Sequence, residues 1–509
     1  MKDIREGGPV EKRARSASPG VIRNIILLIS LYLLSLLLMA IFGGDYLVFR
    51  SLFGFWTLFF LALVLSLIGS DLYGRMRDWN PRWILISAFA IGLILHLPFL
   101  FRDPIMSQDV FRLERRGELL LAGNFPYEDF NVNKPPLYIW MVGLFSLPFG
   151  PEQLAFRFFF SIINSLIPVV MILIHRNTVV RKRHHIDLPL GIHLPPMNWF
   201  DAAIAYLLCP IPILETAMAG HFDPIVIITT LFAYLYLVKN RSLFSGLLLG
   251  AGFSLKLYPM FIAPVFFFSL KGWRERLKLF VGFWIVPVVS SIPVLLRKPS
   301  LIIDYIRYQF VDWYTGYSLQ GILEFILDNA DLPLWIAGRL MMIILVTGFL
   351  FLLARGIVGR RDRLDAVIPI VLTFILGLYG LVQATAFITA GTAGTVETIV
   401  GMVGIVFSTV AVVASFYTFL HGYSGKMEGS KFSLKALFQG SIDIENVAYI
   451  SSAILVLVIF TSSQFHPWYI PWVLPFLFAS GRPYWIWSAL LGMWAATSGY
   501  YPPWELGGF

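Results

Sequence analysis

The chain has 509 residues, of which 58% are hydrophobic and only 14% are charged, and its mean hydropathy is +0.75. Soluble domains carry about 25% charged residues, so this deficit excludes an ordinary soluble protein and predicts a polytopic membrane protein. The net charge of +9 fits basic cytoplasmic loops that meet anionic lipid. Nucleic-acid binding is a poor alternative, because no basic stretch is interleaved with aromatic residues. The single cysteine, Cys209, excludes an internal disulfide and a cysteine cluster for a metal.

Residues 1–20 are polar and basic, and they predict a cytoplasmic tail before a single transmembrane domain over residues 21–509. Only helices and closed barrels satisfy their backbone hydrogen bonds in lipid, and the apolar runs are too long for barrel strands. The expected fold class is all-α, a polytopic transmembrane helical bundle of about 13 to 15 membrane elements with a short extracytoplasmic loop layer. The candidate spans are Val21–Phe42, Leu52–Ser70, Trp83–Phe101, Leu154–Ile174, Phe200–Ala219, Pro224–Val238, Leu279–Leu296, Leu334–Ala354, Val367–Ala384, Ile399–Leu420, Val447–Thr461, Trp468–Ala479 and Trp485–Thr497.

The excess of Lys and Arg in short loops places the N-terminus inside and the end of the third span outside. Two apolar segments do not fit a simple crossing. A full crossing by Pro135–Gly150 would put the basic loop after His175 on the outer side, so we expect this segment to be re-entrant or to lie at the outer interface. Leu243–Leu270 lies between two basic segments that are both expected inside, so it must enter the membrane and return to the same side. Its turn, LKLYP, carries Lys256 and Tyr258 toward the outer half of the membrane.

The first outer loop, residues 102–135, carries the first candidate site. Its sequence SQD places Asp109 shortly after the third span, and we expect a mixed-charge helix over Asp109–Leu121 on the membrane surface. A lone acid there is also compatible with simple surface polarity. The loop that follows is rich in Gly, Asn and Pro, and function concentrates on such loops. We assign acceptor binding to five residues of this region: Arg112, Tyr127, Glu128, Asp129 and Lys134.

The sequence GHFD, residues 220–223, lies between two predicted spans and carries the second candidate site. Glu215, His221 and Asp223 cluster at this junction, and charged groups at membrane depth are costly, which makes them functional candidates. Asp223 begins a span, so its carboxylate is alternatively the N-cap of that helix. Asp109 and Asp223 reach the same membrane face by independent routes, which favours both as catalytic residues.

Lys256 is the strongest basic signal, because a lysine at the tip of an apolar hairpin is costly unless it meets an anion. We expect Lys256 and the hydroxyl of Tyr258 to hold a donor phosphate in the outer leaflet, since lysine binds phosphate as a point charge. The alternative is a structural ion pair with Asp223 or Glu215. Two residues of later outer loops are weaker candidates for the same phosphate: Arg307 and His466. A lone histidine beside Pro and Trp, such as His466, is more often an interfacial side chain than a ligand.

No nucleotide-binding signature is present, since the chain lacks a Rossmann glycine fingerprint, a P-loop and an HExxH sequence. The acids lie on the face that lacks nucleotide sugars, so an enzyme there needs a substrate supplied through the membrane, such as a polyprenyl-phosphate-linked sugar. A secondary transporter or lipid flippase is the alternative, although such proteins often show inverted repeats and midplane charges. A membrane scaffold would not explain why three separate stretches deliver acids and a lysine to one side.

Four sequence elements, in order, resemble integral-membrane glycosyltransferases of the GT-C superfamily. They are SQD followed by LLAGNFPYEDFNVNKPPLYIW, then GHFDP, LLLGAGFSLKLYP and QFHPWYIPWVLPFL. The last three are similar to those of mannosyltransferases that use dolichyl-phosphate-mannose, including enzymes of GPI-anchor assembly and their prokaryotic relatives. The resemblance reaches across about Trp83 to Pro483 and implies a GT-C-like fold.

The resemblance also implies roles for three residues. Asp109 matches the first-loop acid that serves as base or orients the acceptor, Asp223 matches the later acid at the start of a span, and Lys256 matches the lysine near the donor phosphate. The chain departs from the pattern by an extra N-terminal helical hairpin, Val21–Ser70, and by a single acid rather than a pair at Asp109. The need for a divalent metal therefore stays open, and no other cofactor is expected.

The expected function is transfer of a sugar, mannose by resemblance, from a polyprenyl- or dolichyl-phosphate donor to a lipid-linked or surface glycan acceptor. Asp109 would remove the proton of the acceptor hydroxyl and Lys256 would stabilise the leaving phosphate, with inversion at the anomeric carbon. We expect a multi-pass protein of the plasma membrane, or of the endoplasmic reticulum in a eukaryote, with its active site on the outer or lumenal face. The sequence leaves the sugar, the acceptor and the length of the lipid carrier open.

Overall fold

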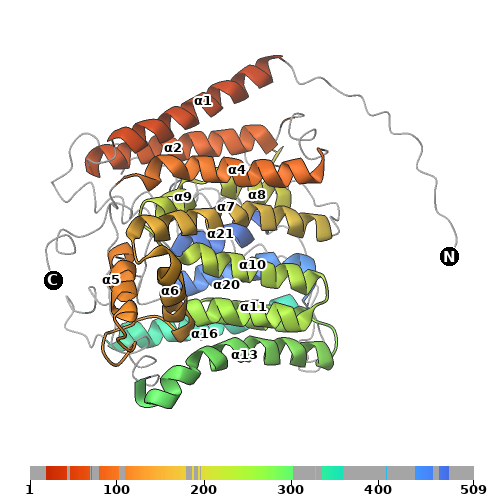
Figure 1. The fold of residues 1–509 in the computed structure, drawn as a ribbon. Coiled ribbons are helices and arrows are strands. Elements are labelled where there is room, and N and C mark those ends of the chain that lie inside the picture. The colour runs from red at the N-terminus through yellow and green to blue at the C-terminus, as the bar shows by residue number, and fades with distance from the viewer. Residues whose placement is uncertain are drawn as a thin grey trace.

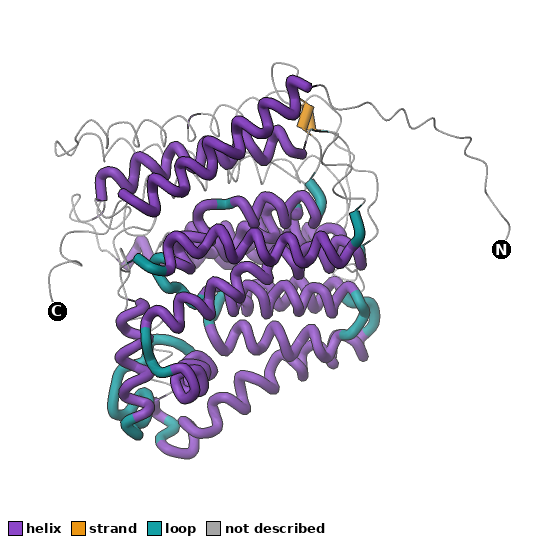
Figure 2. The backbone as a smooth tube through the Cα atoms, turned by 45° about the horizontal axis from the view of Figure 1, so that its top comes forward, coloured by secondary structure: helices purple, strands orange, loops and turns teal. Residues whose placement is uncertain are grey.

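The computed structural model of the protein describes residues 19–42, 46–68, 70, 79–102, 109–178, 186–187, 193–194, 197–301, 327, 335–358, 409, 442–461 and 469–480. The regular structure of these residues is helical (Figure 2), apart from β1 (Ile186–Asp187), which pairs antiparallel with β2 (His193–Leu194). This confirms the expected all-α class. The helices are α1 (Pro19–Phe42), α2 (Tyr46–Ile68), α4 (Pro81–Leu100), α5 (Asp109–Leu121), α6 (Pro136–Phe149), α7 (Gln153–Asn177), α8 (Trp199–Leu208), α9 (Pro210–Ala217), α10 (Asp223–Val238), α11 (Ser242–Leu255), α12 (Pro259–Ser269), α13 (Trp273–Arg297), α16 (Trp335–Val358), α20 (Ile444–Thr461) and α21 (Ile470–Ala479).

The described helices include five that are long and apolar enough to cross a membrane, and a sixth crossing results if the bent pair α8 and α9 counts as one span. The long helices run side by side in one bundle (Figure 1), and many of their large apolar side chains face outward. The protein is therefore an integral membrane protein. Helices α1 and α2 form the expected N-terminal hairpin. Apart from residue 409, three predicted spans lie outside the described residues: Val367–Ala384, Ile399–Leu420 and Trp485–Thr497.

One expected span, Phe200–Ala219, is broken into two helices. Helices α8 and α9 meet at Cys209, and their axes differ by 53°. Pro210 lacks a backbone N–H, so the ladder of helical hydrogen bonds cannot continue through this point. The side chain of Asn164 on α7 donates a hydrogen bond of 3.2 Å to the carbonyl of Pro212, which ties the broken region to its neighbour. Breaks of this kind are tolerated in lipid when nearby helices supply polar partners.

Helices α5 and α6 lie together at one end of the bundle, across the direction of the long helices (Figure 1). Helix α5 has the bounds expected for the surface helix, Asp109–Leu121. Helix α6 has 14 residues, which span about 21 Å at 1.5 Å per residue and fall short of the hydrocarbon thickness of about 30 Å. This geometry agrees with an element that does not cross the membrane.

Helix α11 approaches α13 so closely that their backbones touch. A Cβ atom added at Gly250 would lie 2.1 Å from the carbonyl oxygen of Phe283, and one at Gly246 would lie 2.2 Å from that of Leu279. From the other side, a Cβ at Gly282 would lie 2.5 Å from a carbonyl oxygen of α11. Small residues permit such contact, and helix association in lipid depends on van der Waals packing. The contact holds α11 against α13.

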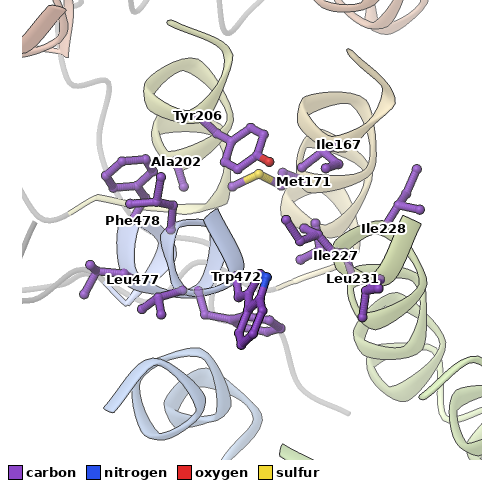
Figure 3. Packing of buried hydrophobic residues seen from close by; sticks show 14 of the residues in the cluster. Ile167, Met171, Ala202, Tyr206, Ile227, Ile228, Leu231, Trp472, Leu477 and Phe478 are labelled. Carbon is purple, nitrogen blue, oxygen red and sulfur yellow. The ribbon is translucent and has the colours of Figure 1, made fainter. Parts of the chain in front are cut away.

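Buried side chains of four helices fill the interior of the bundle. Figure 3 shows side chains of α7, α8, α10 and α21 that meet around a common centre. The labelled residues are Ile167, Met171, Ala202, Tyr206, Ile227, Ile228, Leu231, Trp472, Leu477 and Phe478.

Replacing Gly250 by alanine should destabilise the protein, because the new methyl group has no room beside the Phe283 carbonyl and the two helices must separate. Overpacking of this kind costs about 1–3 kcal/mol, and thermal unfolding in detergent measures it. Gly143→Ala on α6 is the matched control, since its Cβ would meet only the flexible end of Leu120, at 3.3 Å. Equal unfolding temperatures for the two variants would contradict the close approach of α11 and α13.

Candidate functional site

Arg157 on α7 fixes the helix ends from which the candidate site is built. Its buried guanidinium donates hydrogen bonds to the carbonyl groups of Ala217, Arg102 and Phe99, at 2.7, 2.6 and 2.5 Å. These carbonyls lie at or just beyond the C-terminal ends of α9 and α4, where helices leave acceptors unsatisfied. Arg157 therefore holds the start of the first outer loop beside the GHFD turn. Sequence reasoning missed this residue, because a lone arginine in an apolar run does not reveal its partners.

Gly220 allows the turn between α9 and α10 to lie directly against α5. Its φ angle is +72°, and a Cβ atom there would lie 2.8 Å from Cβ of Val110 and 3.3 Å from Cγ of Arg157. Only glycine tolerates both the positive φ and this contact without strain. Because Val110 follows Asp109, the close approach brings His221 beside the Asp109 carboxylate.

Asp109, His221 and Glu215 form a line of ionisable side chains. The Nδ1 atom of His221 lies 3.3 Å from Oδ2 of Asp109, and its Nε2 atom lies 3.3 Å from Oε2 of Glu215. Burial by itself raises the pKa of Asp109. The hydrogen bond and charge of His221, with the nearby cations Lys134 and Arg112, outweigh burial and bring that pKa well below its usual range. The Asp109 side chain is 23% exposed, so it is an ionised carboxylate that an incoming molecule can reach.

Lys256 is enclosed at the turn between α11 and α12. Its Nζ atom lies 2.7 Å from Oδ1 of Asp223, so the ion pair with Asp223 is present. The same Nζ atom lies 5.3, 5.3 and 4.4 Å from the ring centres of Phe222, Tyr469 and Trp472, and the indole N–H of Trp472 donates to the same carboxylate oxygen. Aromatic faces attract cations, so the ammonium is held from several sides. Asp223 is the first residue of α10 and Phe222 is its N-cap, and the Asp223 carboxylate binds Lys256 and Trp472 instead of capping the helix.

Lys134 brings a second cation to the same place. Its Nζ atom lies 5.9 Å from the ring centre of Phe222, the ring that Lys256 also faces. Burial, together with the charge of Lys256, lowers the pKa of Lys134 to about 8, while the carboxylates of Asp109 and Asp223 oppose this shift. Two lysines therefore face the ring of Phe222, and the carboxylates of Asp109 and Asp223 lie close enough to act on Lys134. We call these five residues the charged cluster.

Three of the residues assigned to acceptor binding make contacts within the first outer loop or with α13. The carboxylate of Asp129 accepts a 2.6 Å hydrogen bond from a backbone N–H four residues earlier, and the hydroxyl of Tyr127 donates one of 2.6 Å to the carbonyl of Lys134. Glu128 pairs at 2.7 Å with Arg297 at the end of α13. These contacts shape the loop that delivers the Lys134 ammonium to the cluster.

The remaining predicted residues differ in their placement. Arg112 lies 3.4 Å from Oδ1 of Asp109, one turn along α5, and is half-exposed. Tyr258 is buried and stacks on Trp472, with ring centres 4.4 Å apart and planes at 11°, so its ring forms a wall behind Lys256. Two predicted phosphate ligands lie outside the described residues: Arg307 and His466.

Sequence reasoning missed the aromatic partners of Lys256. Phe222 stands next to Asp223 within GHFD, and a cation predicted at membrane depth needs aromatic faces as well as a carboxylate, so this neighbour was a readable signal. Tyr469 and Trp472 come from the WYIPW sequence, more than two hundred residues along the chain from Lys256. Their contact depends on how α21 packs, and no local pattern reveals it.

A cavity of about 580 Å³ lies at the opposite end of the bundle from the charged cluster. It is formed where α7, α10 and α12 end and where α8, α11 and α13 begin, with His175, Asn198, Tyr234 and Leu270 among its walls. No member of the charged cluster lines it. This cavity is therefore separate from the candidate catalytic residues.

Replacing Lys256 by methionine should destabilise the fold, because it leaves the Asp223 carboxylate buried without its cation. Breaking a buried pair costs about 3–5 kcal/mol, and adding Asp223→Asn to the same chain should recover part of the loss. Lys278→Met is the matched control, since Lys278 pairs with Glu275 at 2.6 Å on an exposed surface, where ion pairs contribute little. Thermal unfolding in detergent compares the four proteins, and a Lys256→Met variant as stable as the control would contradict the enclosed pair.

Comparison with known proteins gives one finding on the family. The model of glycosyltransferase family 87 matches residues 135–379, a region that contains Asp223 and Lys256. No curated protein and no solved structure matches the chain. Family 87 consists of membrane glycosyltransferases of the GT-C type, so the match confirms the resemblance seen in the sequence, and the chain is an integral-membrane glycosyltransferase of that type.

Proposed function

We propose that this GT-C-type membrane glycosyltransferase moves a sugar from a polyprenyl- or dolichyl-phosphate donor to a hydroxyl of a lipid-linked or surface glycan, with inversion. The observation that carries the proposal is the charged cluster, in which a reachable carboxylate, Asp109, lies near Lys134, and Lys134 and Lys256 face the same aromatic ring. The cluster lies at one end of an apolar helical bundle. Mannose is the sugar that the sequence resemblance favours.

The two lysines fit a donor phosphate. An ammonium has three N–H donors, and Asp223 occupies one donor of Lys256 in the described contacts. Lys134 approaches the same ring from the first outer loop, so a phosphate near Phe222 would meet two cations of different origin. A donor with a lipid tail suits this place, because the surrounding helices expose apolar side chains along which an isoprenoid chain can lie.

Accessibility separates the roles of the carboxylates. The side chain of Asp109 is 23% exposed, whereas those of Asp223 and Glu215 are 3% and 12% exposed. An acceptor hydroxyl can approach Asp109 within hydrogen-bond reach, which a general base requires. Asp223 instead acts through Lys256, whose position it fixes.

The proposed reaction is a single displacement. The acceptor oxygen gives its proton to Asp109 and forms a bond to the anomeric carbon, and the bond from that carbon to the phosphate oxygen breaks. The negative charge that develops on the leaving phosphate meets Lys134 and Lys256, and electrostatic stabilisation of this kind usually contributes more to catalysis than any other single effect. One displacement inverts the configuration. No three His, Cys, Asp or Glu side chains of the described residues are arranged to hold a metal, and the need for a divalent metal stays open.

The orientation in the membrane follows from the distribution of basic residues. His175 and Arg176 end α7, and Lys271 and Arg274 flank the start of α13, at the end of the bundle opposite the charged cluster. The excess of basic residues in short cytoplasmic loops supports a cytoplasmic N-terminus and an active site on the outer or lumenal face. The membrane would be the plasma membrane, or the endoplasmic reticulum in a eukaryote.

Asp109→Asn should abolish most sugar transfer, because an amide cannot accept the proton and such a base is worth about 10²- to 10⁴-fold in rate. The assay is transfer of labelled mannose from a polyprenyl-phosphate donor to a lipid extract by purified protein in lipid. Glu118→Gln is the control, since Glu118 lies on the same helix but is exposed and paired with Arg115. Near-full activity of Asp109→Asn would remove Asp109 as base. No transfer by the wild type with any of several polyprenyl-phosphate sugars would overturn the proposed donor.

At low donor concentration, the rate of sugar transfer should fall as the pH rises above about 8. Lys134 has a pKa of about 8, so it loses its charge, and its attraction for phosphate, as pH rises through that value. We expect kcat/KM for the donor to fall by about tenfold per pH unit there, since kcat/KM reports groups of the free enzyme. Lys134→Arg stays charged and should keep a flat profile. The same decline in both proteins would assign the decline to another group.

A further inference from the structure

His221 stands between two carboxylates, and this arrangement constrains its protons. Each ring nitrogen faces a carboxylate oxygen at 3.3 Å, Nδ1 that of Asp109 and Nε2 that of Glu215. A neutral imidazole has one N–H and one lone pair, so with both carboxylates ionised one of the two contacts would set a lone pair against a negative oxygen. An imidazolium has two N–H donors and satisfies both contacts.

The ring of His221 is enclosed between the two acids. The side chain of His221 is 1% exposed, and opposite charges interact more strongly away from water. Other charged side chains surround the line formed by Asp109, His221 and Glu215. They are Arg112 on α5, Lys134 before α6, Arg157 on α7, and the pair of Asp223 with Lys256. Arg157 is committed to three carbonyl groups, and Lys256 to Asp223, so Glu215 is the acid placed to balance a charge on His221.

We propose that His221 and Glu215 are positioning residues for Asp109: Glu215 holds His221 as an imidazolium, and the imidazolium keeps the Asp109 carboxylate ionised and aimed at the acceptor hydroxyl. This inference rests on the proposed function, in which Asp109 is the base. Glu215 touches no substrate in this arrangement and acts through His221. The consequence is a base that stays ionised when the surroundings become acidic.

The role predicts a change in pH dependence rather than a uniform loss of activity. Without the charge on His221, burial of Asp109 is opposed only by Lys134 and Arg112, so its pKa rises. Below the new pKa the base is protonated, and kcat/KM for the acceptor falls by about tenfold per pH unit. Above it the base is ionised again, and activity returns toward that of the wild type. A neighbouring opposite charge lowers the pKa of a carboxylate by about 1–3 units. We therefore expect the acid limb of the pH profile, the part where activity falls as the pH is lowered, to move up by a similar amount.

Two variants and one control test this. His221→Asn keeps an N–H donor near the Nδ1 position without the charge, and Glu215→Gln removes the acid while keeping a polar side chain. The control is Asp201→Asn, also a carboxylate-to-amide change in the bent pair of helices. Asp201 accepts a 2.7 Å hydrogen bond from the backbone of Asn198 in the capping box of α8, so its loss should lower the unfolding temperature only.

The measurements are kcat/KM for the acceptor between about pH 4.5 and 8, thermal unfolding, and the side-chain ¹⁵N resonances of ¹⁵N-histidine-labelled protein. We expect an acid limb at higher pH in both variants, no shift in the control, and an imidazolium signal at neutral pH that His221→Asn removes. Equal loss at every pH, or an unmoved profile, would overturn the proposal. So would a neutral His221 signal in the wild type. The nitrogen spectrum needs no turnover, so a wild type without transfer would refute the proposed function while this readout still decides the state of His221.

Discussion

The ion pair between Lys256 and Asp223 joins three parts of the chain that no local interaction would bring together. Lys256 lies at the turn of the α11–α12 hairpin, Asp223 begins α10, and Trp472 of α21 donates to the same carboxylate. A lone charge at membrane depth costs several kcal/mol, so each partner is stable there only with the other. The pair therefore fixes the relative positions of the helices whose ends surround Phe222. The remaining charged side chains are arranged around this fixed point.

A second constraint sets the distance between the first outer loop and the GHFD turn. Arg157 binds the carbonyl groups that end α4 and α9, and Gly220 removes the Cβ atom that would keep Val110 away. The consequence is that Asp109, which begins α5, meets His221 from another part of the chain. Asp109 and Lys134 of the first outer loop thus meet residues of the GHFD turn and of the α11–α12 turn, so the site is complete only when these three segments pack together.

The site divides its charges by accessibility. Asp109 is reachable, whereas Asp223 and Glu215 are enclosed, each beside a cationic or basic partner. In the proposed reaction this division gives similar carboxylates different purposes: the reachable one would meet the acceptor, and an enclosed one would position a neighbour. Lys134 differs from these carboxylates, because burial and the charge of Lys256 destabilise its ammonium group. The negative charge of a bound phosphate would stabilise that ammonium group again.

The sequence by itself determined the helical class, the bounds of α5, the N-terminal hairpin, and the choice of Asp109, Asp223, Lys256 and Lys134 as candidates. Apolar runs of membrane length and the cost of charge in lipid are local properties, so they can be read along the chain.

The tertiary structure alone decided that Lys256 pairs with Asp223 rather than Glu215, and that α21 supplies Trp472. It also decided that Arg157 binds three helix-end carbonyls and that His221 lies between two acids. The break at Cys209 and the contact of α11 with α13 belong to the same group. These features depend on which helices pack together, and packing partners far apart in sequence leave no periodic signal in either segment.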